Sequence, residues 1–229
     1  MSAPLTATTF PLVCWSCQER TISTHFCSSC GKIQQLSRTV DYFAFFGLPR
    51  KLRIDSGGLE KKFMELSWKL HPDKFVQADE RERELALMSS SQLNDAYRTL
   101  RDPISRVEYL LAIEGARKEG EQKQQAPPEL LEEVFELNES LDELREATAA
   151  GGELRALKAR LLTAEKNFQK KLGGVDAELD GVFGEWDASL EADAPDTVRT
   201  SLKTRMNDLL NRRSYIRNLV ANVAKELSA

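Results

Sequence analysis

The sequence predicts a mainly α-helical protein with three parts: a small cysteine knuckle at the N-terminus, a helical hairpin and a C-terminal three-helix bundle. The knuckle follows from two Cys-x-x-Cys pairs within the first thirty residues. The hairpin follows from a His71-Pro72-Asp73 tripeptide that separates two amphipathic runs. The bundle follows from three apolar stripes at helical spacing after residue 127, and no convincing strand pattern occurs after residue 40.

Composition limits the function classes that this chain can serve. It has 229 residues, of which 41% are apolar and 30% charged, enough for about two small domains. A net charge of −4 argues against a general nucleic-acid or anionic-membrane role, and no apolar run could span a bilayer. The first thirteen residues lack the features of a secretory signal. We therefore expect a cytoplasmic protein, with the mitochondrial matrix as the alternative.

The cysteines are predicted to form a metal site. Cys14 and Cys17 form one pair, and Cys27 and Cys30 form the other. In a reducing compartment such pairs are metal ligands before they are disulfides. Folding the intervening segment would bring the four thiolates into a tetrahedral sulfur site, which suits zinc. All four ligand positions are filled by protein, so we expect one structural zinc ion per chain in a zinc knuckle.

Other chemistry for the cysteines stays open from sequence alone. An iron–sulfur cluster shares the preference for soft, tetrahedral sulfur ligands. Two disulfides are a second alternative. A redox Cys-x-x-Cys is less favoured because no βαβ pattern surrounds either pair. His25 could replace one of the cysteines as a ligand.

Two helices are predicted on either side of the tripeptide. The first carries an apolar stripe, and the return helix is expected from Asp79 to Arg101. Pro72 disfavours helical geometry at His71 and removes a backbone donor, so the first helix must end there. The tripeptide is therefore expected at the exposed tip of an antiparallel hairpin. The stripe of the first helix consists of Leu59, Phe63, Leu66 and Leu70.

His-Pro-Asp between two such helices is the signature of the J-domain, which stimulates ATP hydrolysis by the seventy-kilodalton heat-shock chaperones. The short aromatic segment from Asp41 to Pro49 resembles the first J-domain helix. The alternative is an ordinary proline turn in which His71 and Asp73 only cap helices. The resemblance implies that the tripeptide and the basic face before it contact an acidic surface on the chaperone ATPase. The residues implied are His71, Pro72, Asp73, Lys62, Lys69 and Lys74.

Further blocks narrow the resemblance. A short helical segment, 104–113, follows the hairpin, and generic J-proteins lack its Arg106–Leu111 block (RVEYLL). With His71–Phe75 (HPDKF), Leu93–Pro103 (LNDAYRTLRDP) and the tetracysteine segment, the chain resembles the HscB co-chaperones of iron–sulfur cluster assembly. The expected organisation is a zinc-binding segment at 1–38, a J-domain at 39–115, a linker at 116–127 and a client-binding bundle at 128–229.

The three apolar stripes of the bundle are expected to be joined by Gly-rich or acidic connections. The first runs from Leu130 to Leu144, the second from Leu154 to Leu172, and the third follows Pro195 and ends at Leu227. Leu131 and Phe135 lie outside the core stripe of the first helix. They form either a partner site or a wider face that packs against the J-domain.

The resemblance favours the partner site, because HscB proteins bind the iron–sulfur scaffold IscU through this helix. Phe168 also fits the core by its spacing, and Glu132 and Asn138 depart from the residues found in the family. The implied client contacts are Leu131, Phe135, Glu136, Glu139, Glu143 and Phe168.

The predicted function is that of a co-chaperone, not an enzyme. It would deliver an IscU-type scaffold to a DnaK/HscA-class chaperone, stimulate its ATPase and promote cluster transfer. A J-protein with another client is the first alternative, and a zinc-dependent nucleic-acid binder is disfavoured by charge. Catalysis by His71 beside Asp73 is disfavoured because the chain has no nucleophile motif, glycine-rich phosphate loop or open metal site.

Overall fold

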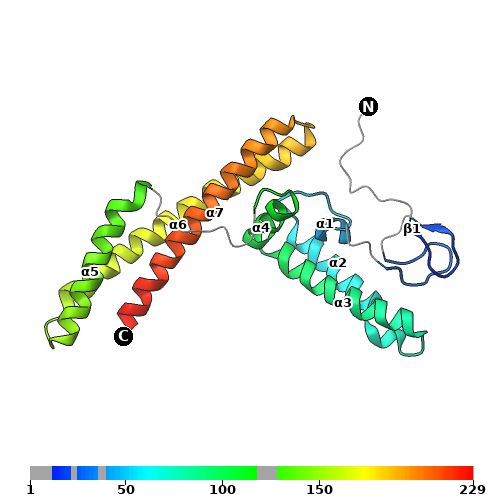
Figure 1. Ribbon diagram of the computed structural model, residues 1–229, viewed down its shortest axis with the longest axis horizontal. Coiled ribbons are helices and arrows are strands. Elements are labelled where there is room, and N and C mark those ends of the chain that lie inside the picture. The colour runs from blue at the N-terminus through cyan, green and yellow to red at the C-terminus, as the bar shows by residue number, and fades with distance from the viewer. Residues whose placement is uncertain (1–11, 22–24, 36–39, 118–127, 229) are drawn as a thin grey trace. The chain divides into compact units, whose positions relative to one another are not determined.

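The computed structural model describes residues 12–21, 25–35, 40–117 and 128–228 (Figure 1). The chain divides into two compact units. The first comprises Met1–Gly115 with Trp186–Ala194, and the second comprises Ala116–Glu185 with Pro195–Ala229. The mainly α-helical fold class is confirmed. Most of the expected linker, residues 118–127, lies outside the described residues.

A two-stranded antiparallel ribbon opens the first unit. Strand β1 (Leu12–Val13) pairs with β2 (Arg20–Thr21), with Leu12 opposite Thr21. Each Cys-x-x-Cys pair lies in a tight turn, the first between these strands and the second between Phe26 and Ile33, which form an isolated antiparallel bridge.

Helix α1 (Tyr42–Phe45) is short because it is a single capped turn. The Asp41 carboxylate accepts a hydrogen bond from the Ala44 amide at 2.9 Å, and Phe43 and Phe45 are buried. The Tyr42 amide donates to the Tyr109 hydroxyl at 2.9 Å, and the two rings stack with centroids 4.4 Å apart. Tyr109 belongs to α4 (Pro103–Ile113), which begins at a proline and is capped by Asp102.

Helices α2 (Ser56–Lys69) and α3 (Glu80–Arg101) form the hairpin of the first unit (Figure 1). Asp55 caps α2 and Asp79 caps α3. Phe63 stacks on Tyr97 across the hairpin with centroids 4.1 Å apart. As expected, α2 ends before the proline, and Pro72–Phe75 forms a separate 3₁₀ turn, η1, at the tip. The helices enclose one core, to which α1, α2, α3 and α4 contribute Phe43, Leu59, Leu70, Leu93, Leu100, Leu110 and Leu111.

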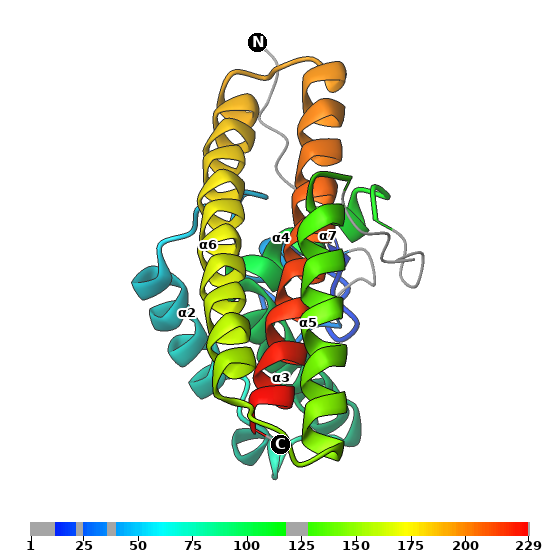
Figure 2. The ribbon, with the colours of Figure 1, turned by 90° about the vertical axis from the view of Figure 1, so that its left-hand side faces the viewer.

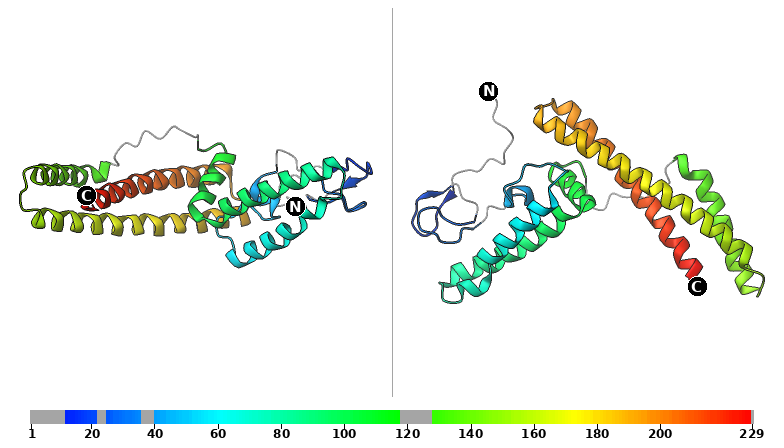
Figure 3. Two further views of the ribbon diagram at one scale, coloured as in Figure 1. Left: turned by 90° about the horizontal axis from the view of Figure 1, so that it is seen from below. Right: turned by 180° about the vertical axis from the view of Figure 1, so that it is seen from behind.

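The second unit is a bundle of three helices after a short 3₁₀ turn, η2 (Pro128–Leu130). Its helices are α5 (Leu131–Ala149), α6 (Arg155–Glu191) and α7 (Asp196–Ser228), and they run side by side in Figures 2 and 3. The buried stripes of the first and third helices follow the predicted spacing. Core residues in the three helices include Leu137, Leu141, Leu144, Leu161, Phe168, Leu202, Leu209, Ile216 and Val223.

Helix α6 is longer than the sequence stripe indicated. The expected stripe ended at Leu172, but the helix continues through Gly173 and Gly174 to Glu191. Each glycine inside a helix costs about 1 kcal/mol relative to alanine, and this part of α6 has four, Gly173, Gly174, Gly181 and Gly184. Burial of each large apolar side chain contributes about 1.5–3 kcal/mol, so the five buried here together outweigh that cost. The buried side chains beyond Gly174 are Val175, Leu179, Val182, Phe183 and Trp186.

The last turns of α6 belong to the first unit and hold the loop between α1 and α2. The Asp187 carboxylate accepts hydrogen bonds from the amides of Leu52 at 2.7 Å and Arg53 at 2.9 Å. Burial raises the pKa of Asp187, and these two donors partly oppose that rise. The Trp186 indole donates to the Arg50 carbonyl at 2.9 Å. The sequence prediction missed this cluster because it placed no helix here.

No helix within the described ranges combines the length and the low polarity that a bilayer crossing requires.

Candidate metal centre and interaction surfaces

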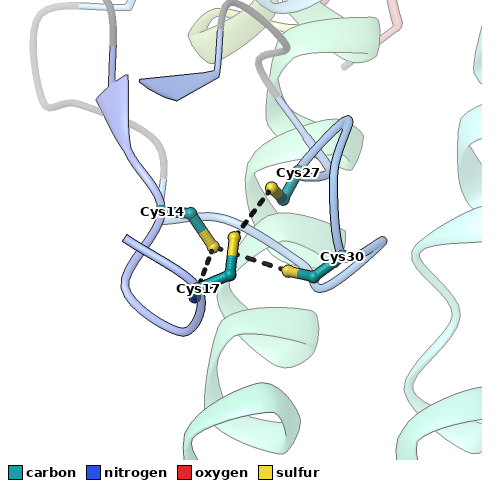
Figure 4. Close-up of side chains that lie close together, drawn as sticks. All are labelled: Cys14, Cys17, Cys27 and Cys30. Carbon is teal, nitrogen blue, oxygen red and sulfur yellow. Dashed lines mark hydrogen bonds between the residues drawn. The ribbon is translucent and has the colours of Figure 1, made fainter. Parts of the chain in front are cut away.

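The structure brings the four cysteines together (Figure 4). Their sulfur atoms all lie within 4.8 Å of one another. Cys14 Sγ is 3.6 Å from Cys30 Sγ, and Cys17 Sγ is 3.7 Å from Cys27 Sγ. With metal–sulfur bonds of about 2.3 Å, a regular tetrahedron of thiolates has edges of about 3.8 Å. The four cysteines therefore have the spacing needed to hold a single metal ion.

The two knuckles share one backbone design. The amide of the residue after each second cysteine donates to the carbonyl of the first cysteine: Gln18 to Cys14 at 3.0 Å and Gly31 to Cys27 at 2.9 Å. Both of these residues have a positive φ, 61° at Gln18 and 74° at Gly31. Only glycine adopts this conformation without strain, which explains Gly31 and makes Gln18 the exceptional position.

Hydrogen bonds to sulfur favour the thiolate form at Cys14 and Cys27. At Cys17 the Glu19 backbone hydrogen bond also lowers the pKa, but burial and the neighbouring thiols outweigh it and raise the pKa to about 11. Burial alone would raise the pKa of Cys14, but the Cys17 and Ser16 amides donate to its sulfur at 3.5 and 3.4 Å. Their combined effect with the neighbouring thiols lowers the pKa of Cys14 to about 6. The Gln34 side-chain amide donates to the same sulfur at 3.4 Å. Backbone donation, led by the Cys30 amide, also lowers the pKa of Cys27.

The sulfur separations also bear on the alternatives for the cysteines. All four thiols are free, and separations of 3.6 and 3.7 Å are far longer than a disulfide bond of about 2.05 Å. An iron–sulfur cluster would place several metal atoms between the thiolates and so spread them further apart. His25 is engaged elsewhere, because its Nε2 lies 2.9 Å from the Phe45 carbonyl and its ring packs edge-on against Phe45.

The His-Pro-Asp tripeptide lies at the tip of the hairpin, as expected. His71 caps the 3₁₀ turn, since its Nδ1 accepts a hydrogen bond from the Asp73 amide at 3.3 Å. The side chains of His71 and Asp73 are nevertheless 53% and 86% exposed. The tip is therefore locally ordered while both polar side chains remain open to a partner.

The three lysines predicted to flank the tripeptide differ in their surroundings. Lys69 and Lys74 are exposed, whereas Lys62 is half-buried and donates to the Phe46 carbonyl at 3.0 Å. The sequence prediction overlooked Trp68, which is 71% exposed and lies under Lys74, with the ammonium 4.0 Å from the ring centroid. Met64, one turn earlier on α2, is 63% exposed. Trp68 and Met64 could have been recognised from the sequence as exposed residues, because both are large apolar residues outside the Leu59–Leu70 stripe.

The predicted client residues divide between surface and core. Leu131 and Phe135 are 55% and 72% exposed and lie one turn apart on α5. Glu136 and Glu139 are exposed near them, and Glu143 pairs with Arg160 at 2.9 Å. The prediction that Phe168 contacts a client is corrected by its burial. Phe168 is 2% exposed and lies in the bundle core, so it is not available to a client.

Comparison with known proteins identifies the family. Residues 126–180 match the family model described as HSCB C-terminal oligomerisation domain. A co-chaperone protein HscB homologue of Vibrio vulnificus is 39% identical over 140 residues, covering 61% of this chain and 80% of that protein. An iron–sulfur cluster co-chaperone protein HscB homologue of Arabidopsis thaliana is 38% identical, covering 59% of this chain and 53% of that protein.

The solved structures agree with the sequence comparison. The crystal structure of human co-chaperone protein HscB matches 93% of this chain and 96% of its own length, with 25% identity and a TM-score of 0.61. This chain thus combines a cysteine knuckle, a hairpin with a His-Pro-Asp tip and a three-helix bundle. Its sequence is also similar to most of the length of an HscB homologue. The chain belongs to the HscB co-chaperone family.

Proposed function

We propose that this protein presents an IscU-type iron–sulfur scaffold to a DnaK/HscA-class chaperone, stimulates the ATPase of that chaperone and so promotes cluster transfer. The observation that carries the proposal is the presence of two separate exposed surfaces on one chain. One is the His-Pro-Asp tip of the first unit, and the other is the Leu131–Phe135 surface of the second. The protein itself would form and break no bonds, since the partner hydrolyses the ATP.

The chaperone-facing surface would comprise the tripeptide and the lysines near it. Asp73 and His71 offer exposed polar atoms on a turn whose backbone is already fixed by the His71 cap. Lys69 and Lys74 add positive charge, which complements an acidic partner and accelerates encounter. Trp68 and Met64 add exposed apolar area beside this charge. Lys62 would contribute from an earlier position on α2, where its ammonium donates a hydrogen bond to the Phe46 carbonyl.

The client-facing surface would be centred on Leu131 and Phe135. Exposed aromatic and aliphatic side chains one turn apart are typical anchors for a partner protein, because covering them removes apolar area from water. Glu136, Glu139 and Glu143 would favour a scaffold with basic residues around its own apolar contact. A different client is the second candidate, favoured by Glu132 and Asn138, where this chain departs from the family pattern.

The metal is proposed to be one zinc ion held by Cys14, Cys17, Cys27 and Cys30. The support is a closed set of four thiol ligands at the spacing of a single tetrahedron. Zinc bound there would supply a structural cross-link between the two knuckles. Cytoplasm or mitochondrial matrix is the proposed compartment, because both keep such thiols reduced.

We propose a zinc-binding segment at 1–38, a J-domain at 39–115, a linker at 116–127 and a client-binding bundle at 128–229. The contribution of Trp186–Ala194 to the first unit means that the bundle helix α6 also supplies residues next to the J-domain loop.

Two variants test the two surfaces separately. His71→Gln should abolish stimulation of the chaperone ATPase while leaving scaffold affinity unchanged. Leu131→Ala with Phe135→Ala should weaken the scaffold complex by more than about 2 kcal/mol, as the loss of anchor residues does, and should leave basal stimulation unchanged. Steady-state ATP hydrolysis and calorimetric titration of the scaffold measure the two effects. Wild-type stimulation by His71→Gln would reject the chaperone assignment, and wild-type scaffold affinity of the double variant would reject the client assignment.

A further inference from the structure

A salt-bridge cluster joins the cysteine knuckle to the start of α3. Lys32, two residues after Cys30, donates to the Asp79 carboxylate at 2.8 Å and to the Glu82 carboxylate at 2.9 Å. The Lys32 side chain is only 33% exposed and that of Glu82 only 12% exposed. Lys32 therefore forms two ion pairs with carboxylates at the start of α3, and one of these carboxylates is largely buried.

A second contact reinforces the first. Trp15, inside the first Cys-x-x-Cys pair, donates its indole N–H to the Ile33 carbonyl at 2.8 Å. The Arg81 guanidinium lies 4.6 Å from the Trp15 ring centroid, and the Lys32 ammonium lies 5.1 Å from it. Both knuckles thus contact the first turn of α3, one through Trp15 and the other through Lys32.

The contacted turn is where the loop from the His-Pro-Asp tip ends. Asp79 is the N-cap of α3, and its Oδ1 accepts from the Glu82 amide at 2.9 Å while Oδ2 accepts from Lys32. One carboxylate therefore fixes the helix start with one oxygen and the knuckle with the other. Only the residues from Val76 to Ala78 separate this cap from the η1 turn that carries Pro72 and Asp73.

We propose that metal binding at the four cysteines is energetically coupled to the order of the α3 N-terminus and of the adjoining His-Pro-Asp loop, with Lys32 as the positioning residue. The cysteine backbone holds Lys32 in place, since the Cys27 amide donates to the Lys32 carbonyl at 2.9 Å. Folding of the knuckle around a metal fixes this backbone, and loss of the metal releases it. The coupling between metal binding and the α3 N-terminus does not rest on the proposed function. Only the effect of that coupling on a chaperone rests on it.

Coupling between two sites is reciprocal, which makes it measurable from the metal side. If the metal stabilises the Lys32 contacts to α3, those contacts must strengthen metal binding by the same factor. Couplings of this kind are typically about five- to 150-fold, and a partly exposed ion-pair cluster belongs near the lower limit. We therefore expect a change of about three- to tenfold in metal affinity when the carboxylates are neutralised.

The first measurement is zinc affinity, by competition with a chromogenic chelator, in the double variant Asp79→Asn, Glu82→Gln. Asparagine preserves the helix cap and glutamine is nearly isosteric, so only the charges are lost. Asp95→Asn is the matched control, because Asp95 pairs with Arg98 on the same helix and is remote from Lys32 in sequence. We expect zinc binding about three- to tenfold weaker in the double variant and unchanged in the control. Lys32→Met should weaken zinc binding by a similar factor. Lys32→Arg keeps the positive charge and should restore zinc binding to the wild-type level.

The second measurement uses the wild-type chain and needs no variant to fold. Hydrogen exchange at the amides of residues 82–84 should be faster after zinc removal, while exchange near the α3 centre stays the same. Unchanged zinc affinity in the double variant, or unchanged exchange on zinc removal, would overturn the coupling. His71→Gln separates this outcome from the proposed function: it should leave zinc affinity unchanged, and its effect on the chaperone ATPase judges the function alone.

Discussion

Two residues adopt the same left-handed conformation at equivalent places in the knuckles, Gly31 and Gln18. A Cβ added at Gly31 would meet no atom within 4 Å, so a substitution there changes only the backbone preference. That preference is about 1–2 kcal/mol for a residue other than glycine. The first knuckle already carries this cost at Gln18, whereas the second does not.

Gly31→Ala is therefore expected to weaken zinc binding by about five- to thirtyfold, the equivalent of 1–2 kcal/mol. Gln18→Gly is the matched opposite change and should leave zinc binding equal or tighter. Chelator competition measures both. If Gly31→Ala has no effect, the positive φ is not required by the metal-bound knuckle.

Two phenylalanines of the second unit test the difference between core and surface. Phe168 is 2% exposed and Phe135 is 72% exposed. Phe168→Ala should lower the free energy of unfolding by about 3–5 kcal/mol, because it leaves a cavity. Phe135→Ala should change it by about 0.5 kcal/mol or less. Urea unfolding measures both, and a large loss of stability in Phe135→Ala would show that Phe135 packs in a core.

At the scale of the elements, the continuous α6 makes a prediction about its glycines. Gly173 and Gly174 lie mid-helix, and a Cβ at either would meet no atom within 4 Å. Alanine at both positions should raise the free energy of unfolding by about 1–2 kcal/mol in total. A matched change at Gly151, where φ is 67°, should instead destabilise the chain. Destabilisation by the alanines at 173 and 174 would indicate that the helix breaks there.

The contact between α5 and α7 should make stability depend on pH. Arg145 donates to Glu226 at 2.6 Å and to Asp142 at 3.2 Å, and Lys225 lies beside Glu226. The hydrogen bond from Arg145 lowers the pKa of Glu226. A carboxylate whose pKa is lower in the folded state stabilises the fold above its unfolded pKa and loses this contribution as the pH falls through the folded value.

Glu226→Gln should accordingly lower the melting temperature at pH 7, and its difference from wild type should shrink as the pH falls below about 4. Thermal unfolding followed by circular dichroism at several pH values measures this. A difference that grows on acidification would contradict the assigned direction.

The predictability of these elements differed for physical reasons. Local signals sufficed for the hairpin, because the Leu59–Leu70 stripe, Pro72 and the aspartate caps act within a few residues. The cysteine site followed from spacing alone. The extent of α6 did not, since Gly173 and Gly174 suggest an interruption and only burial beyond them overrides it. The contact of Lys32 with Asp79 joins positions 47 residues apart, a distance at which neither periodicity nor a motif is informative.

For the whole molecule, we propose that one chain joins a chaperone-facing surface to a client-facing surface. The two surfaces lie in different compact units, the His-Pro-Asp tip in the first and the Leu131–Phe135 surface in the second. If the protein delivers a scaffold, a chain that lacks either surface cannot give scaffold-dependent stimulation of the chaperone. A mixture of two chains that each lack a different surface cannot give it either. If the two surfaces acted independently, the mixture would be active.

The most direct test is scaffold-dependent acceleration of the chaperone ATPase by a mixture of two variants, His71→Gln and Leu131→Ala/Phe135→Ala. Wild-type protein should stimulate hydrolysis more strongly when the scaffold is present than when it is absent. The mixture should show only the scaffold-independent stimulation that the second variant retains. Restoration of the scaffold-dependent increase by the mixture, with each variant defective alone, would contradict the requirement for both surfaces on one chain.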